Sequence, residues 1–177
     1  MAKRGPRGSS KTAALVRGTA RSAVASVAGR LPWSQDDDPI RMLEADHRRL
    51  EALFEEGEKS TARGVKKRTE LLERLTEELQ LHERREEKVL YPALKPHTAA
   101  RDVVLEGYQE HHVADVLVRE LHALPRDDER WGAKFKVLKE NIEHHIEEEE
   151  GLMFRTARGV LSREELQAIA ARMKKMR

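Results

Sequence analysis

The sequence contains no cysteine, which excludes disulfide bonds, thiolate metal sites and cysteine nucleophiles. Aromatic residues make up only 4 % of the 177 residues, while Ala, Glu, Leu, Lys and Arg are abundant. That composition favours helices and argues against a β-sandwich or β-barrel. No apolar run approaches the ~18 residues that a membrane-spanning helix needs. We therefore expect an all-α protein that is long enough to bury a real core.

Acidic residues are missing from the first 35 positions, which hold seven basic residues: Lys3, Arg4, Arg7, Lys11, Arg17, Arg21 and Arg30. We predict a basic, partly disordered extension at residues 1–36 and a helical domain at residues 37–177. The extension fits a solubilising tail, an arm that contacts nucleic acid or anionic lipid, or a transit peptide. The expected location is cytoplasmic, or organellar if the extension is a transit peptide.

Proline and capping residues divide the domain into helices. Asp38 followed by Pro39 predicts a helix start, and Pro92 and Pro125 predict the ends of two later helices. The predicted long helices cover residues 39–57, 64–91, 100–124 and 130–156, and a Ser-Arg-Glu-Glu capping box at 162–165 opens a short last helix. Four long helices with short connections favour an antiparallel up-down-up-down four-helix bundle.

The chain contains a twofold pseudo-repeat. The second predicted helix has a stripe at steps of three and four: Leu72, Leu75, Leu79, His82, Glu86 and Val89. The fourth helix repeats it 63 residues later: Phe135, Leu138, Ile142, His145, Glu149 and Leu152. The first and third helices match more loosely at an offset of 64, judged at His47 and His111. All of these stripes are predicted to face the core.

Polar residues interrupt every stripe at its middle. Each stripe carries one histidine, and two of them add a glutamate four residues later, at Glu86 and Glu149. Residues at i and i+4 lie on one helix face about 6 Å apart. In an antiparallel bundle the six groups would meet at one level: His47, His82, Glu86, His111, His145 and Glu149.

Two interpretations of these six groups are open. Core histidines are often only hydrogen-bonded, and glutamate-rich helix faces are usually solvated. However, a buried carboxylate without a partner is costly, and no Lys or Arg occupies the stripe beside Glu86 or Glu149. Divalent cations would resolve the conflict, and imidazole with carboxylate suits iron, manganese or zinc. The recurrence of the same pattern in both halves favours the metal site.

These segments resemble the four helices of the hemerythrin family, the bacterial HHE cation-binding domains: "DHRRLEALF" (46–54), "LHERREEKVLYP" (81–92), "EHHVADVLVREL" (110–121) and "HHIEEEEGLMF" (144–154). The resemblance covers roughly residues 37–170. It implies a four-helix bundle that holds a non-haem centre of two Fe ions, with Mn or Zn as alternatives. The implied ligands are His47, His82, Glu86, His111, His145 and an acid from the last helix.

The sequence departs from the family pattern at two points. Oxygen-carrying hemerythrins have a histidine four residues after the third helix's ligand, where this chain has Asp115. The set therefore resembles a bacterial subgroup with four histidines and two glutamates, and reversible O2 carriage is not expected. On the last helix the family pattern selects Glu150, whereas the stripe and the repeat select Glu149. We predict Glu149, with Glu150, Asp115, Glu51 and His112 as alternative ligands.

The resemblance implies a protein that binds, senses or detoxifies a small ligand: O2, hydrogen peroxide or nitric oxide. Whether it turns the ligand over is open, and the candidate activities are peroxidase or catalase-like activity and nitric oxide reduction. The alternative is a non-enzymatic metal-binding bundle that stores or senses iron or oxygen. In that case the basic extension would bind nucleic acid or an anionic membrane.

Overall fold

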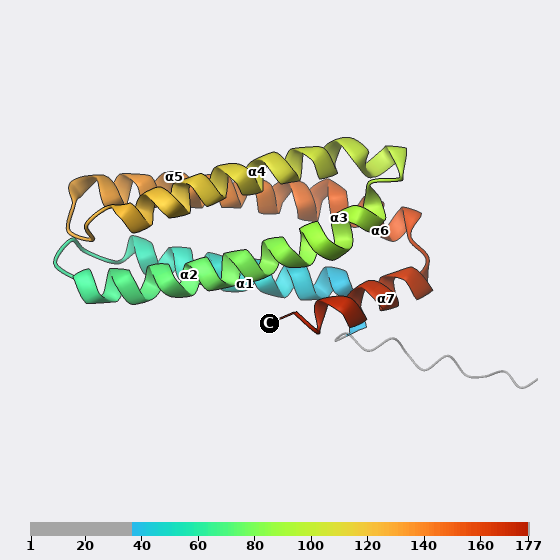
Figure 1. The fold of residues 1–177 in the computed structure, drawn as a ribbon, viewed down its shortest axis with the longest axis horizontal. Coiled ribbons are helices and arrows are strands. Elements are labelled where there is room, and N and C mark those ends of the chain that lie inside the picture. The colour runs from blue at the N-terminus through green and yellow to red at the C-terminus, as the bar shows by residue number, and fades with distance from the viewer. Residues whose placement is uncertain (1–36, 177) are drawn as a thin grey trace, which may run out of the picture. The chain divides into compact units, whose positions relative to one another are not determined.

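The computed structural model describes residues 37–176, and the predicted extension at residues 1–36 lies outside them. The described part consists of helices and loops without a β-strand, which confirms the all-α prediction for it (Figure 1). Its elements are α1 (Pro39–Glu58), α2 (Val65–Arg85), η2 (Glu86–Leu90), α3 (Tyr91–Leu94), α4 (Thr98–Ala123), α5 (Glu129–Glu148), η3 (Glu149–Met153), α6 (Phe154–Val160) and α7 (Arg163–Met173). No helix within it is long and apolar enough to cross a membrane.

The long helices pack side by side as a bundle (Figure 1). α1 packs mainly against α2, and α4 mainly against α5, so that the two sequence halves form two helix pairs. Contacts of α1 with α5 and of α2 with α4 join the pairs. The short helix α7 packs against α1 and η2 and covers one end of the bundle.

Helix starts follow the capping chemistry of the sequence. Asp38 Oδ1 accepts a hydrogen bond of 3.0 Å from the Ile40 amide at the start of α1. Ser162 and Glu165 exchange the two hydrogen bonds of a capping box at the start of α7. Both predicted starts are therefore confirmed.

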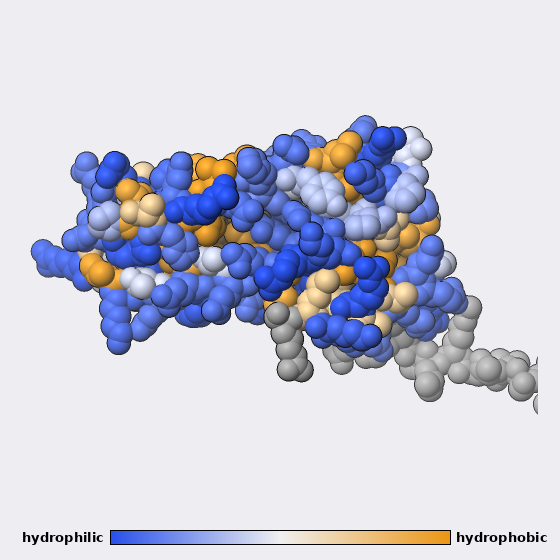
Figure 2. Space-filling model, viewed as in Figure 1, coloured by the Kyte–Doolittle hydropathy of each residue, from blue (hydrophilic) through white to orange (hydrophobic). Residues whose placement is uncertain are grey.

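Within the described residues the apolar core forms two clusters, one at each end of the bundle. One gathers around Leu43, Leu90 and Phe154 and includes side chains of α7. The other gathers around Leu50 and Leu138. The surface in Figure 2 is mostly hydrophilic, with hydrophobic side chains in small separate groups. Three of the stripe histidines fall in sequence between the residues of these two clusters, and His145 lies directly before Ile146, the last member of the second cluster on α5, so a polar layer divides the core.

Each half contains a π-helical turn that begins at its stripe glutamate, Glu86 in η2 and Glu149 in η3. A π-turn hydrogen-bonds five residues back and accommodates one extra residue in the turn. The repeat predicts a core position for Leu152, but that side chain is 52 % exposed while Met153 is fully buried. The prediction for Leu152 is wrong, because Met153 takes the buried position in η3, whereas Val89, the repeat partner of Leu152, is buried in η2.

Pro92 does not end the second long helix as predicted, since α3 continues to Leu94. A proline inside a helix donates no N–H and leaves the carbonyl four residues earlier without its usual partner. That carbonyl belongs to Lys88, and it accepts a hydrogen bond of 3.0 Å from Arg172 Nη2 of α7. A contact distant in sequence therefore satisfies the group that Pro92 leaves free.

Candidate metal centre

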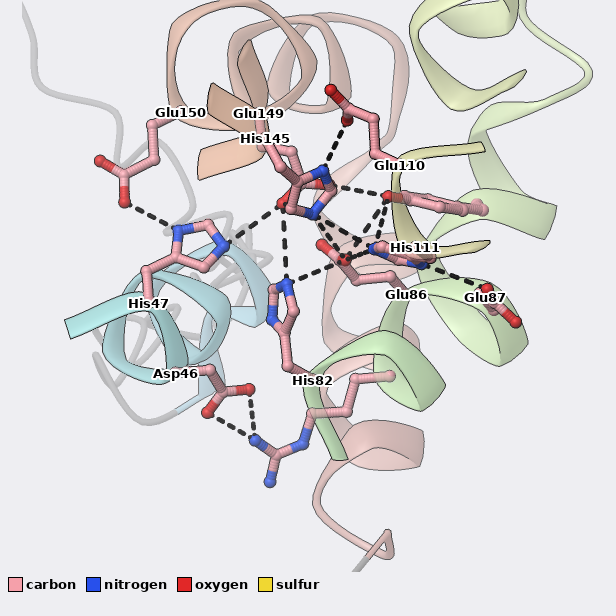
Figure 3. Close-up of polar contacts among 12 residues, drawn as sticks. Asp46, His47, His82, Glu86, Glu87, Glu110, His111, His145, Glu149 and Glu150 are labelled. Atoms are coloured by element: carbon pink, nitrogen blue, oxygen red, sulfur yellow. Dashed lines mark hydrogen bonds and ion pairs between the residues drawn. The ribbon is translucent and has the colours of Figure 1, made fainter. Parts of the chain in front are cut away.

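The structure brings the six predicted ligands together in the polar layer of the core. They come from six elements, and each is at most 2 % exposed (Figure 3): His47 on α1, His82 on α2, Glu86 on η2, His111 on α4, His145 on α5 and Glu149 on η3. Each π-turn begins at the glutamate of the set. The geometry predicted from the repeat is therefore present, and metal ligation by these residues stays a prediction.

The two glutamates lie at the middle of the cluster. Glu86 Oε2 is 3.1 Å from His82 Nε2 and 3.3 Å from His111 Nε2. Glu149 Oε2 is 3.3 Å from His47 Nε2 and 3.4 Å from His145 Nε2. Ligand atoms within 4.8 Å of one another form two overlapping groups of four, one with His82, Glu86, His111 and His145, the other with His47, His82, Glu86 and Glu149.

The donor atoms of this cluster fit a bound cation. Four of them are buried and lack a hydrogen-bond partner: His47 Nε2, His82 Nε2, Glu86 Oε1 and Glu149 Oε2. Several lie at ion-pair distance from one another, but their geometry is not that of a hydrogen bond. Buried polar atoms are normally satisfied, and orphaned ones carry a free-energy penalty. Imidazole nitrogens with carboxylate oxygens are a donor set that binds divalent transition metals.

Without metal, protons balance the charges of the cluster. Neighbouring imidazoles, opposing the effect of burial, hold the pKa of the Glu86 carboxyl well below its usual range. Burial lowers the pKa of His111, but the nearby carboxylates of Glu86 and Glu87 outweigh it and raise that pKa to about 9. The pKa values of His47 and His145 are also raised, because nearby carboxylates outweigh burial. A cation that binds here must displace these protons.

Three outer carboxylates hold the far ring nitrogens of the histidines (Figure 3). The Nδ1 atoms of three histidines each face one of them: His47 faces Glu150 at 2.8 Å, His145 faces Glu110 at 2.8 Å and His111 faces Glu87 at 3.2 Å. A carboxylate at Nδ1 favours the tautomer with a proton there, so that the Nε2 lone pair points into the cluster. His82 Nδ1 has no such partner.

A sequence model of the hemerythrin HHE cation-binding domain matches residues 38–157. The chain belongs to this family. A crystal structure of a hemerythrin HHE cation-binding domain-containing protein from Mycobacterium kansasii is similar in fold, with a TM-score of 0.67 and 24 % identity. The match covers 78 % of this chain and 86 % of that one. A comparison with curated proteins gave no match.

Tyr91 is a further member of the hemerythrin site that the sequence analysis did not single out. Its hydroxyl donates a hydrogen bond of 2.9 Å to Glu149 Oε1 and lies 3.5 Å from both Glu86 Oε2 and His111 Nε2. Burial and the charge of Glu149 raise the pKa of Tyr91 well above its usual value, so the hydroxyl keeps its proton. One sequence signal was present: Tyr91 and Phe154 are repeat partners, 63 residues apart. Phe154 also lies at the centre, where its ring stacks on His47 with the ring centres 5.6 Å apart.

The alternative ligands lie outside the cluster. Glu150 reaches only the outer nitrogen of His47 and also pairs with Arg48, so the structure places Glu149 rather than Glu150 at the centre. Glu51 pairs with Arg48 at the surface. Asp115 and His112 are both exposed. Asp115 lies four residues after His111, but Ala114 takes the buried position on α4 instead.

Proposed function

We propose that this hemerythrin-family protein holds a non-haem di-iron centre at which O2, hydrogen peroxide or nitric oxide binds. The proposed ligands are His47, His82, Glu86, His111, His145 and Glu149. The observation that carries the proposal is the pair of overlapping four-ligand groups, which share His82 and Glu86. Two ions side by side would use both groups, and carboxylates from different helices bridge such pairs in other bundle-core sites. We also propose that the four long helices follow an up-down-up-down order.

Iron is the proposed metal because the resemblance to the hemerythrin family implies it, while four imidazoles with two carboxylates and no thiolate would suit iron, manganese or zinc. Bound iron would supply redox chemistry and an open coordination position for the small ligand. The six donors are almost fully buried between two apolar clusters, which favours a ligand of a few atoms over an organic substrate.

The protein's own residues prepare the site for such a ligand. Glu86 and Glu149 place two negative charges where the cations would lie, and the outer carboxylates orient three of the imidazoles. Tyr91 holds a proton on its hydroxyl oxygen 2.9 Å from Glu149 Oε1. This hydroxyl is a hydrogen-bond donor inside the buried layer, and it would stabilise negative charge on a small ligand held there.

The proposal is tested by purifying the full chain in air without a metal-binding tag and measuring metal content together with the near-ultraviolet spectrum. We expect about two irons per chain and charge-transfer absorption that shifts when azide or peroxide is added. Zinc, or no metal after anaerobic loading with Fe²⁺, would refute the di-iron proposal. Turnover of peroxide or nitric oxide by the loaded protein would then separate an enzyme from a binder, store or sensor.

A second candidate function rests on the seven basic and no acidic residues of positions 1–35. We propose that this segment contacts a polyanion, either nucleic acid or an anionic membrane, while the bundle binds metal. Binding to DNA or to phosphatidylserine vesicles that weakens with salt and disappears when residues 1–36 are removed would support it.

We expect a cytoplasmic location, and fractionation of cells that express the full chain would distinguish it from an organelle.

A further inference from the structure

A second group of potential metal ligands lies outside the buried cluster, between α4 and α5. It consists of Glu110, His144 and Glu148, whose ligand atoms lie within 4.8 Å of one another. His144 Nε2 is 3.5 Å from Glu148 Oε1 and 3.9 Å from Glu110 Oε1. Ligand atoms around a tetrahedral ion at 2.1 Å are about 3.4 Å apart, so small side-chain adjustments would complete the site. His144 is 61 % exposed, which leaves room for water ligands.

The two halves of the pseudo-repeat differ at this place. In the first half Asp46 takes the position of Glu110, and its carboxylate is neutralised by Arg85, whose Nη1 is 2.7 Å from Asp46 Oδ1 (Figure 3). The repeat equivalent of Arg85 is Glu148, so the second half has a carboxylate where the first has a guanidinium. Within residues 37–176, no Lys or Arg forms an ion pair with Glu110 or Glu148. The second half therefore has no guanidinium at this position.

The surroundings of the group favour positive charge. Glu148 and His144 line a surface pocket of about 460 Å³, and its wall adds three more acids, Asp102, Glu106 and Glu147. No Lys or Arg is among the residues that line it. A concave surface of one charge sign raises the local concentration of counter-ions.

Glu110 connects the outer group to the buried cluster. Its Oε1 faces His144 of the outer group, and its Oε2 is 2.8 Å from Nδ1 of His145, a predicted ligand of the centre. One carboxylate therefore touches both an exposed imidazole and a buried one. A cation at the outer group would lie one side chain away from the centre.

We propose that Glu110, His144 and Glu148 form an outer site for a divalent transition-metal ion, such as Fe²⁺ or Zn²⁺, through which metal enters the buried centre. One histidine and two carboxylates leave the remaining positions to water, and exchange with solvent is fast because the site is open. The entry role rests on the proposed metal centre, whereas binding at the outer site does not.

The binding step is tested with Zn²⁺ by equilibrium dialysis of the full chain loaded with iron. We expect one further Zn²⁺ per chain, with an affinity that falls at least about 10-fold in H144A and in E148Q. E147Q is the matched control, because it removes the same charge from the same pocket without removing a ligand. Unchanged binding in H144A, or an equal loss in E147Q, would overturn the outer site.

A companion measurement separates this inference from the proposed centre. In the double variant H82A/E86Q, which removes the residues shared by both buried groups, one Zn²⁺ should still bind and should be lost when H144A is added. If the wild type holds no iron but this Zn²⁺ binds, the proposed function fails and the outer site stands.

The entry role is tested by the rate of Fe²⁺ uptake into metal-free protein. H144A and E148Q should fill the centre more slowly than wild type and E147Q, and reach the same final content. Equal uptake rates in all four proteins would overturn the entry role.

Discussion

Gly107 lies where α4 passes the hydroxyl end of Tyr91. A Cβ atom at residue 107 would be 2.5 Å from the Tyr91 hydroxyl oxygen and 3.0 Å from its Cζ. Ordinary contact needs about 3.5 Å, so Gly107→Ala must push the ring away by about 1 Å. The ring has little freedom, because it stacks on His111 and packs edge-on against Tyr108. The displacement therefore weakens the hydrogen bond from the Tyr91 hydroxyl to Glu149.

The expected destabilisation follows from three contributions. Overpacking costs about 1–3 kcal/mol, and the lost hydrogen bond costs about 1 kcal/mol. Alanine offsets about 1 kcal/mol through its higher helix propensity. The net loss for Gly107→Ala is about 2 kcal/mol, or roughly 4–8 °C in melting temperature for a chain of this size. Metal content should also fall, because Glu149 loses the donor that orients it.

Two other glycines supply matched controls in thermal unfolding and metal analysis. At Gly159 an added Cβ meets nothing within 4 Å, so Gly159→Ala should leave stability unchanged or slightly raised. At Gly57 it overlaps the ring of Phe135, which lies ten residues before His145 on α5, about 15 Å along the helix. Gly57→Ala should therefore destabilise the bundle and keep the metal. If Gly107→Ala behaves like Gly159→Ala, or loses no more metal than Gly57→Ala, the reasoning about Tyr91 is refuted.

Three further predictions concern the cluster itself. His82→Ala or Glu86→Gln should remove at least one metal per chain and lower the melting temperature, and unchanged values in both variants would contradict the ligand assignment. Glu149→Gln should lower the metal stoichiometry, whereas Glu150→Gln should keep it with an affinity reduced about 10–100-fold; the reverse pattern in metal titrations would make Glu150 the ligand. The pKa of His111 in the metal-free fold is about 9, above the 6.5 of a free imidazole. Protonated His111 therefore adds on the order of 1–3 kcal/mol to the free energy of unfolding. This stabilisation is complete below about pH 6.5 and is lost as pH rises through 9. Urea unfolding with a chelator present should show this decline, and a flat profile would contradict it.

Local spacing was enough to predict much of the site. The positions of His82 and Glu86, one turn apart on a helix, follow from backbone geometry alone, and the repeat carried the same spacing to His145 and Glu149. The histidines of α1 and α4 also reached the core as predicted.

The supporting groups were missed because their partners are distant in sequence. Glu87 holds a histidine 24 residues away, and Tyr91 reaches a glutamate 58 residues away. A signal for one pair was present, since Glu87 and Glu150 are related by the same offset of 63 as the two central glutamates. The bond from Arg172 to the carbonyl freed by Pro92 had no sequence signal.

The sequence by itself determined the helices, the polar layer of the core and the residue types that meet there, because side-chain periodicity depends only on the local backbone. Tertiary structure alone decided which outer groups support the centre, because Glu87, Glu110 and Glu150 meet histidines of other helices. It also decided that Leu152 is exposed, although its repeat partner Val89 is buried in the equivalent π-turn of η2. A local pattern assumes a regular α-helix, and the packing of helices that are distant in sequence fixes where that regularity breaks.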